Sequence, residues 1–383
     1  MLREVRDDEF ANEFEGDQTP SVLLAAPNFE ERSIGSIDYI LRHCPVPSQR
    51  FHVLITTLQA ARPKEMLDAI KDANVAHCCR MLEVRGVEYV QRKILYPKID
   101  YGASFEALRD FADAKGDMID LYVDISCFPR MMIFNLLDHL MSHRQNEAAG
   151  DLNTRKLRFF YSEPISYPST VNIETLGDIY CVFGRRAFHS EAQKYRLIDN
   201  VIFLNGNSHD VMQTRAIALS DVRSADVNNH YFIYVNKDHF GFSYQKLWQN
   251  VGALKEIRDT GERVRVVFDI EDMTMQLVDT VNSIIERQSG IKESAVFFGC
   301  YGPKILRLSC YLAMRYYQRE SKEIAEKEVD LGEGKKAGLQ KAVMADLLTP
   351  RDSQYTSIYS HGLKSTKLYE FYDVRREERP IKW

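Results

Sequence analysis

The chain has 383 residues, 45% of them apolar, and its 50 basic and 55 acidic residues give a net charge of −5. This length allows two domains with buried cores, and the weak negative charge excludes recruitment of nucleic acid or anionic membranes by overall charge. No apolar run approaches the roughly 20 residues of a membrane-spanning helix, and the charged N-terminus is unlike a secretory signal. We therefore expect a cytoplasmic protein without a membrane partner.

In the first half, short apolar strands alternate with helical patterns, which is the order typical of a parallel sheet covered by helices on both faces. The strands are predicted at 21–27, 51–57, 121–126 and 156–164. A helix is predicted over 104–116, with Ser104 as its N-cap and Gly116 as its stop. These elements predict a Rossmann-like domain over residues 1–190.

The second half repeats this order, and its first two strands begin about 180 positions after their counterparts. Strands are predicted within 200–210, 230–238, 263–270, 294–300 and 367–374, and helices at 243–261 and 273–290. Residues 321–366 are highly charged and are interpreted as an insertion with one helix and a loop. The prediction is therefore an α/β protein of two tandem Rossmann-like modules, the second over 191–383.

One joint between a strand and a helix occurs in both halves. Residues 124–130 read "DISCFPR" and residues 298–304 read "FGCYGPK", so each strand end is followed by a proline and a cation before an apolar helix. Proline is favoured at the first helical position, and the first turn of a helix binds anions through its free N–H groups and its dipole. The recurrence predicts an anion site, although Arg130 and Lys304 could equally be solvated residues at helix starts.

Ligands of open parallel sheets bind outside the carboxyl ends of the strands. The candidate ligand-binding residues at these ends are Asn28, Glu31, Arg32, Asp124, Ser126, Phe128, Arg130, Asn207, Ser208, Tyr301, Gly302 and Lys304. The mixture suits a nucleotide, because cations hold phosphate, aromatic rings stack on bases and amides read polar edges. In the structural alternative, Phe128 and Tyr301 pack in the core and Asp124 accepts N–H groups of its own turn.

A second constellation is "FDIEDM", in which Asp269, Glu271 and Asp272 cluster at a strand end. Carboxylates placed in this way hold Mg²⁺ in phosphoryl and phosphodiester chemistry. Acidic residues are also favoured at a helix start, so the main prediction includes no metal or other cofactor. No second ligand pair accompanies Cys78 and Cys79, as a zinc site would require.

"DISCFPRMM" resembles the fourth-strand motif of CARF domains, the CRISPR-associated Rossmann-fold sensors, in which an Asp, a hydroxyl residue, paired glycines and Thr-Lys lead into an apolar helix. Asp124 and Ser126 stand in place of the first two residues and Arg130 in place of the lysine, whereas Cys127 and Phe128 replace the glycines. Two such modules in one chain resemble the tandem arrangement of SAVED domains. The resemblance implies a sensor of cyclic oligonucleotides in bacterial antiviral defence that switches on an effector.

We therefore expect a nucleotide or oligonucleotide sensor whose strand ends form an anion pocket, and which acts with a separate effector protein or as a homo-oligomer. The alternative is a Mg²⁺-dependent nuclease or nucleotide hydrolase that uses the three carboxylates of "FDIEDM". A sensor leaves its ligand intact and needs the two cations, whereas an enzyme consumes the ligand and needs the carboxylates.

Overall fold

The chain forms two compact units in the computed structural model. The first, called here the N-terminal unit, comprises Met1–Pro168 and Ser357–Trp383, and the second, the inserted unit, comprises Ser169–Thr356, so these bounds differ from the predicted division at residue 190. The structure describes residues 2–14, 17–60, 65–96, 101–116, 118–142, 154–165, 179–181, 198–205, 229–235, 263–267, 273–287, 293–300, 304–330, 342–350 and 361–371.

The N-terminal unit contains a seven-stranded sheet with the order β1-β13-β6-β5-β2-β3-β4. Its strands are β1 (Leu2–Val5), β2 (Ser21–Ala25), β3 (Phe51–Ala60), β4 (Glu88–Tyr96), β5 (Ile119–Asp124), β6 (Thr154–Glu163) and β13 (Ser365–Phe371). The five strands from β6 to β4 are parallel, and β13 runs antiparallel to both β6 and β1. All residues of β2 and β5 are buried, as expected for central strands covered on both faces.

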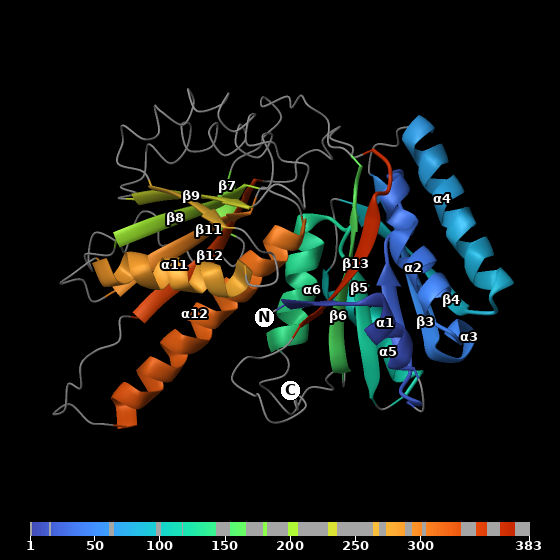
Figure 1. The fold of residues 1–383 in the computed structure, drawn as a ribbon, viewed down its shortest axis with the longest axis horizontal. Coiled ribbons are helices and arrows are strands. Elements are labelled where there is room, and N and C mark those ends of the chain that lie inside the picture. The colour runs from blue at the N-terminus through green and yellow to red at the C-terminus, as the bar shows by residue number, and fades with distance from the viewer. Residues whose placement is uncertain are drawn as a thin grey trace. The chain divides into compact units, whose positions relative to one another are not determined.

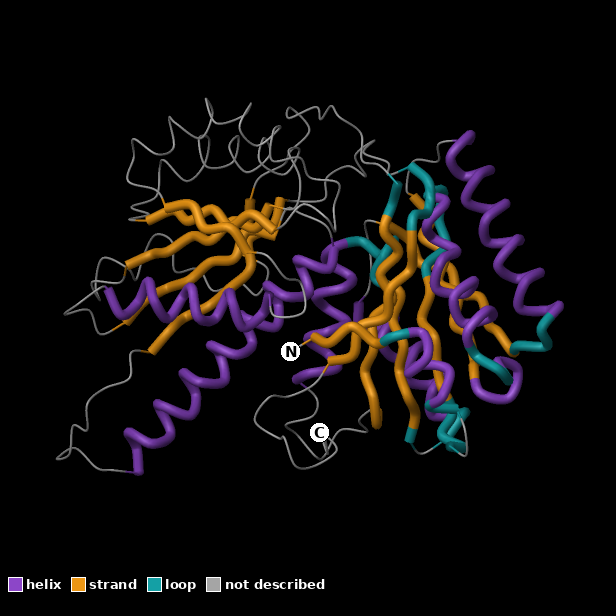
Figure 2. The backbone as a smooth tube through the Cα atoms, in the orientation of Figure 1, coloured by secondary structure: helices purple, strands orange, loops and turns teal. Residues whose placement is uncertain are grey.

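Helices lie on both sides of this sheet (Figures 1 and 2). They are α1 (Asp7–Asn12), the 3₁₀ helix η1 (Glu31–Ile34), α2 (Gly35–His43), α3 (Pro47–Arg50), α4 (Glu65–Val84), α5 (Tyr101–Asp113) and α6 (Arg130–Ser142). Figure 1 shows α2 and α4 on one side and α6 on the other. The predicted apolar face of α6 is confirmed, because Ile133, Leu136, Leu137 and Leu140 are buried.

The inserted unit contains a six-stranded sheet with the order β10-β9-β8-β11-β12-β7. Its strands are β7 (Ile179–Cys181), β8 (Ile198–Asn205), β9 (Asn229–Val235), β10 (Arg263–Val267), β11 (Glu293–Cys300) and β12 (Ala342–Pro350), and its helices are α11 (Met273–Arg287) and α12 (Lys304–Asp330). Five strands are parallel and β7 is antiparallel to β12. The predicted α/β class is therefore confirmed, and the tandem duplication stays a prediction.

The interpretation of residues 321–366 as an insertion is wrong. Residues 321–330 continue α12 without a break, because Glu, Lys and Ala are strong helix formers and no helix stop comes before Gly332. Residues 342–350 then form β12, the strand that pairs in parallel with β11. The apolar strand was not predicted because charged residues precede and follow it.

Two further expectations fail in the structure. Residues 365–371 do not complete the second half, because they form β13 beside β6 in the N-terminal unit, while β7 pairs with the outer side of β12. An apolar run predicts a strand but not the sheet edge to which that strand adds. Ser104 is no N-cap either, because α5 begins at Tyr101 and continues through Ser104.

Candidate functional site

The strand order of the N-terminal unit reverses between β2 and β5. From β2 the chain goes to its neighbour β3 on one side, whereas β5 lies on the other side, so the loops after β2 and β5 leave the sheet at the same end and diverge. Such a switch point is where open α/β sheets bind ligands. The first-half candidate residues come from these two loops and from the helix starts that follow them.

The loop after β2 is built around Asn28. Its side-chain Oδ1 accepts a hydrogen bond from the N–H of Glu30 at 2.7 Å, and its carbonyl accepts one from Asn74 Nδ2 of α4 at 2.7 Å and one from Ser33 Oγ at 3.2 Å. Asn favours such turns because its short side chain bonds the backbone two residues on. The hydrogen bonds fix the loop against α4 and η1.

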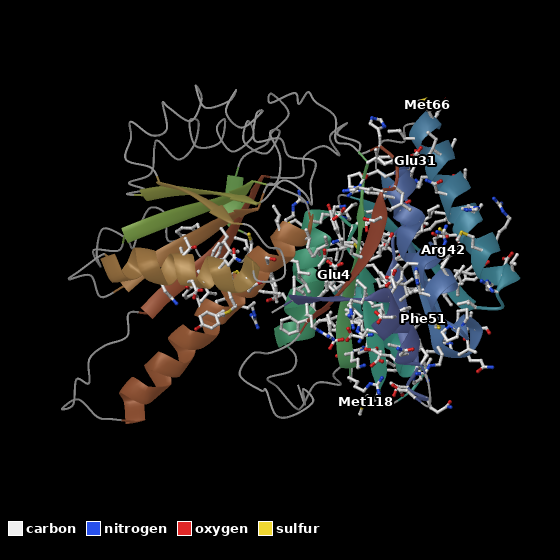
Figure 3. All side chains as sticks on the ribbon, viewed as in Figure 1. Glu4, Glu31, Arg42, Phe51, Met66 and Met118 are labelled. Carbon is white, nitrogen blue, oxygen red and sulfur yellow. The ribbon has the colours of Figure 1, made fainter. Side chains whose placement is uncertain are left out.

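Arg32 is buried in the same loop and is already paired. Its Nε lies 2.7 Å from Glu30 Oε2, and its Nη1 donates to the carbonyl of Ser162 at 3.4 Å. This ion pair neutralises the guanidinium locally, so the expected role of Arg32 as a phosphate ligand would require the exchange of Glu30 for the ligand. Glu31 is exposed beside it and lies at the opposite end of the sheet from Met118 (Figure 3).

The end of β5 carries a buried hydrogen-bond network. Asp124 accepts hydrogen bonds from the Ser126 N–H at 2.8 Å and from Ser36 Oγ at 2.5 Å, and Ser126 Oγ accepts one from the Ser162 N–H at 2.8 Å. The network ties β5 to α2 and β6. Asp124 thus accepts an N–H group of its own turn, as the structural alternative predicts, and Ser126 adds a bond to β6 that the sequence did not predict.

Both predicted cations stand at the first position of a helix. Arg130 begins α6, directly after Pro129, and Lys304 begins α12. Phe128, however, is 1% exposed, so its ring packs in the core and the base-stacking role expected for it does not fit this arrangement. At a joint between a buried strand and an apolar helix, an aromatic side chain packs into the core, where a ligand cannot stack on it.

Two buried polar atoms at this end of the sheet have no hydrogen-bond partner within the described part of the chain: Asn28 Nδ2, a donor, and Glu163 Oε1, an acceptor. Glu163 ends β6, and its other oxygen lies 3.3 Å from Ser365 Oγ and 3.7 Å from Lys364 Nζ. Such orphaned groups are costly unless something binds them. Glu163 is not among the residues predicted from the sequence, although it lies at the carboxyl end of a strand.

The neighbouring thiol of α4 has little nucleophilic character. Burial raises the pKa of Cys78 to about 12, with smaller contributions from Cys79 and Asp124. Since the thiolate is the nucleophile, Cys78 is a packing residue at this site.

Several predicted residues lie outside the described part of the chain. They are the second-half candidates Asn207, Ser208, Tyr301 and Gly302, and the carboxylates of the Mg²⁺ alternative, Asp269, Glu271 and Asp272. Within the described residues, no three His, Cys, Asp or Glu side chains come together in a way that could hold a metal ion. The metal alternative therefore stays a prediction.

No known protein-family model matches the chain, and a search of curated protein sequences gives no match either. Among the described helices, none is both long and apolar enough to cross a bilayer.

Proposed function

We propose that the N-terminal unit binds a nucleotide or cyclic oligonucleotide at the switch point between β2 and β5, and that the protein is a sensor of bacterial antiviral defence that acts on a separate effector. The observation that carries the proposal is that the Asn28 loop and the helix that begins at Arg130 both start at this switch point, at the same end of the sheet. A helix start with a cation suits phosphate, and an amide suits the polar edge of a base.

Ion pairs and hydrogen bonds within the N-terminal unit already occupy some of the predicted ligand-binding residues. Arg32 is neutralised by Glu30, and Asp124 and Ser126 are engaged in the network at the end of β5. In the proposed site Arg130 and the first turn of α6 hold the phosphate. Asn28 donates to the base or sugar from its unpaired Nδ2, and Glu163 accepts through its unpaired Oε1.

The strand order of the two sheets and one sequence motif support the tandem arrangement and the sensor function. When the five parallel strands of each sheet are numbered by their order along the chain, their order across the sheet is 3-2-1-4-5 in both units. Two copies of one module would have this same order. The resemblance of "DISCFPRMM" to the CARF motif supports a cyclic oligonucleotide as ligand, and Lys304 would serve the second module.

The test is a thermal-shift and calorimetric screen against mononucleotides, cyclic di- and trinucleotides and short RNA, with and without Mg²⁺. A ligand at about 100 times its dissociation constant adds roughly 2.7 kcal/mol of stability. Because a charge-assisted hydrogen bond contributes about 1.5–3 kcal/mol, Arg130→Ala is expected to weaken binding about 10- to 100-fold. Lys304→Ala tests the second module in the same way.

Arg42→Ala is the matched control. Arg42 lies in the last turn of α2 and is labelled in Figure 3. Among the described residues its ion pair is with Asp38, four residues earlier in the same helix, at 2.9 Å. The proposal is contradicted if Arg42→Ala and Arg130→Ala weaken binding equally, or if no nucleotide shifts the wild type. Chromatography of the recovered ligand separates the readings, because a sensor returns it intact and the Mg²⁺ enzyme consumes it.

A further inference from the structure

The chain passes between its two units twice, and both crossings adjoin the same part of the N-terminal unit. It enters the inserted unit after Pro168, shortly beyond the end of β6, and returns at Ser357, shortly before β13. The end of β6 and the start of β13 lie side by side, because the two strands are antiparallel neighbours (Figure 1). We call residues 163–165 and 361–365 the stem, since the inserted unit is joined to the chain through them.

Backbone hydrogen bonds hold the two halves of the stem together. The Lys364 N–H donates to the Glu163 carbonyl at 2.8 Å, and the Ile165 N–H donates to the His361 carbonyl at 3.0 Å. Gly362 has a φ of +69°, and a Cβ at this position would lie 2.5 Å from Ile165 Cδ1. Any larger residue at position 362 would therefore strain the backbone and displace Ile165.

The stem begins next to the candidate ligand site. β6 is parallel to β5, so its carboxyl end lies at the same edge of the sheet as the switch point. Ser162 accepts a hydrogen bond from Arg32 Nη1 at 3.4 Å and donates its N–H to Ser126 Oγ at 2.8 Å. Its hydroxyl lies 3.0 Å from Thr366 Oγ1 of β13. A contiguous hydrogen-bond network of this kind can carry coupling between a site and a neighbouring element.

Glu163 belongs to the site and to the stem at once. Its Oε2 lies 3.3 Å from Ser365 Oγ and 3.7 Å from Lys364 Nζ, both on the returning segment. Its Oε1 is buried and has no hydrogen-bond partner within the described part of the chain, which is costly and favours a donor there. Because both oxygens belong to one planar carboxylate, a group bound at Oε1 also fixes the orientation of Oε2.

We propose that the stem responds to the ligand site: a nucleotide whose amino group or hydroxyl donates to Glu163 Oε1 strengthens the pairing of the stem. This inference rests on the proposed function and adds the route by which binding reaches the segments that carry the inserted unit. Coupling between two sites is reciprocal, so a change that loosens the stem weakens nucleotide binding by the same factor.

The reciprocal effect is tested with Gly362→Ala, which alters the stem and removes no group assigned to the ligand. Cyclic dinucleotides and cyclic trinucleotides are titrated by calorimetry into the full chain, as wild type and as variant. A coupling of typical strength predicts that Gly362→Ala weakens binding about fivefold or more. Ser365→Ala removes the hydrogen bond to Glu163 Oε2 without backbone strain, so it tests the same coupling if circular dichroism shows that Gly362→Ala is unfolded.

Gly86→Ala is the matched control. Gly86 also has a positive φ, of +65°, and it lies before β4, at the other end of the sheet from the stem. A Cβ at this position would lie 3.7 Å from Ser48 Cβ, an ordinary contact distance. Gly86→Ala therefore brings the same kind of backbone strain without changing the stem, and it should leave nucleotide affinity unchanged.

Hydrogen exchange measures the stem directly. In the wild type a saturating cyclic nucleotide should slow exchange of the Ile165 and Lys364 amides about fivefold or more, because these two N–H groups pair the stem. In Glu163→Ala the same amides should no longer respond at saturation, since the carboxylate that joins site and stem is absent.

The outcomes separate this inference from the proposed function. If no nucleotide binds the wild type, both are overturned. If a nucleotide binds but leaves exchange of the two stem amides unchanged, the ligand site stands and only the coupling is overturned. The coupling is also overturned if the stem variant and Gly86→Ala bind the nucleotide equally well.

Discussion

In the N-terminal unit β5 ends on the buried carboxylate of Asp124, whereas β11 of the inserted unit has the buried phenyl ring of Phe298 at the matching position of the joint. With the two strands aligned in this way, Tyr122 of β5 matches Val296 of β11. Tyr122 pairs with Arg158 on the neighbouring strand β6, and Val296 pairs with Ala345 on the neighbouring strand β12. Arg158 and Ala345 therefore occupy matching positions in the two sheets. Arg158 and Ala345 are both fully buried.

The same strand order therefore accommodates two different interiors. The order follows from short, right-handed connections between parallel strands, which do not depend on particular side chains. The N-terminal unit can bury a guanidinium because Glu13, next to α1, and Glu370, on β13, reach Arg158 from the two ends of the chain. At this pair of matching positions the N-terminal unit thus buries a paired charge where the inserted unit buries a methyl group.

The largest effect is expected at Arg158. Its Nε donates to Glu370 at 2.8 Å and its Nη1 to the Tyr122 hydroxyl at 3.0 Å, and it also pairs with Glu13. Arg158→Ala removes the partner of two half-buried carboxylates and should lower the free energy of unfolding by about 3–5 kcal/mol. Urea denaturation followed by hydrogen exchange should show the loss in β6 and β13, with β11 and β12 unchanged.

A matched variant separates lost charge pairing from lost volume. Arg158→Met combined with Glu13→Gln and Glu370→Gln leaves no buried charge unpaired and should recover most of the stability, because the other partners of the two carboxylates, Lys156 and Arg3, are partly exposed. The comparison between the units fails if Arg158→Ala costs less than about 1 kcal/mol, the value of an exposed ion pair.

A smaller effect is expected at Asp124. Asp124→Ala leaves the Ser36 hydroxyl and the Ser126 N–H without their acceptor, which should cost about 2 kcal/mol. Thermal and urea unfolding of Asp124→Ala, Ser36→Ala and the double variant form a double-mutant cycle. Because Ser36→Ala removes the same hydrogen bond, the double variant should lose less than the sum of the single variants. Additive losses would show that the network does not couple α2 to β5.

The smallest effect is expected from acid. Burial alone would raise the pKa of Glu13 above its usual 4.5, but hydrogen bonds and charge from Arg158 outweigh burial and lower it. The pKa of Asp17, usually 3.8, is likewise lowered against the effect of burial by Arg155 and Thr19. A carboxylate with a depressed folded-state pKa stabilises the fold above its unfolded pKa and loses that contribution as pH falls through the folded value.

The N-terminal unit should therefore lose stability as the pH falls below about 4, and Glu13→Gln with Asp17→Asn should flatten that loss. Urea midpoints measured by hydrogen exchange between pH 3 and pH 6 check this. An unchanged slope in the double variant would assign the acid sensitivity to other carboxylates.

The sequence predicts the central strands well, because parallel strands buried on both faces read as uninterrupted apolar runs such as 21–25 and 119–124. It fails at β1 and α1, which are too short to show a period, and at β12, which is flanked by charged residues. The rule that ligands bind at strand ends locates the switch point. It cannot find Ser36, which bonds Asp124 across 88 positions of sequence.

The route of the chain through β13 has a consequence for synthesis. β6 is complete at Glu163, but its antiparallel neighbour begins only at Ser365, after the whole inserted unit. At about 5–20 residues per second a ribosome needs roughly 10–40 s to make the intervening stretch. During that interval β6 exposes an unpaired edge, the kind of surface that invites aggregation and chaperone binding. The unit that emerges first from the ribosome is thus the last to be completed.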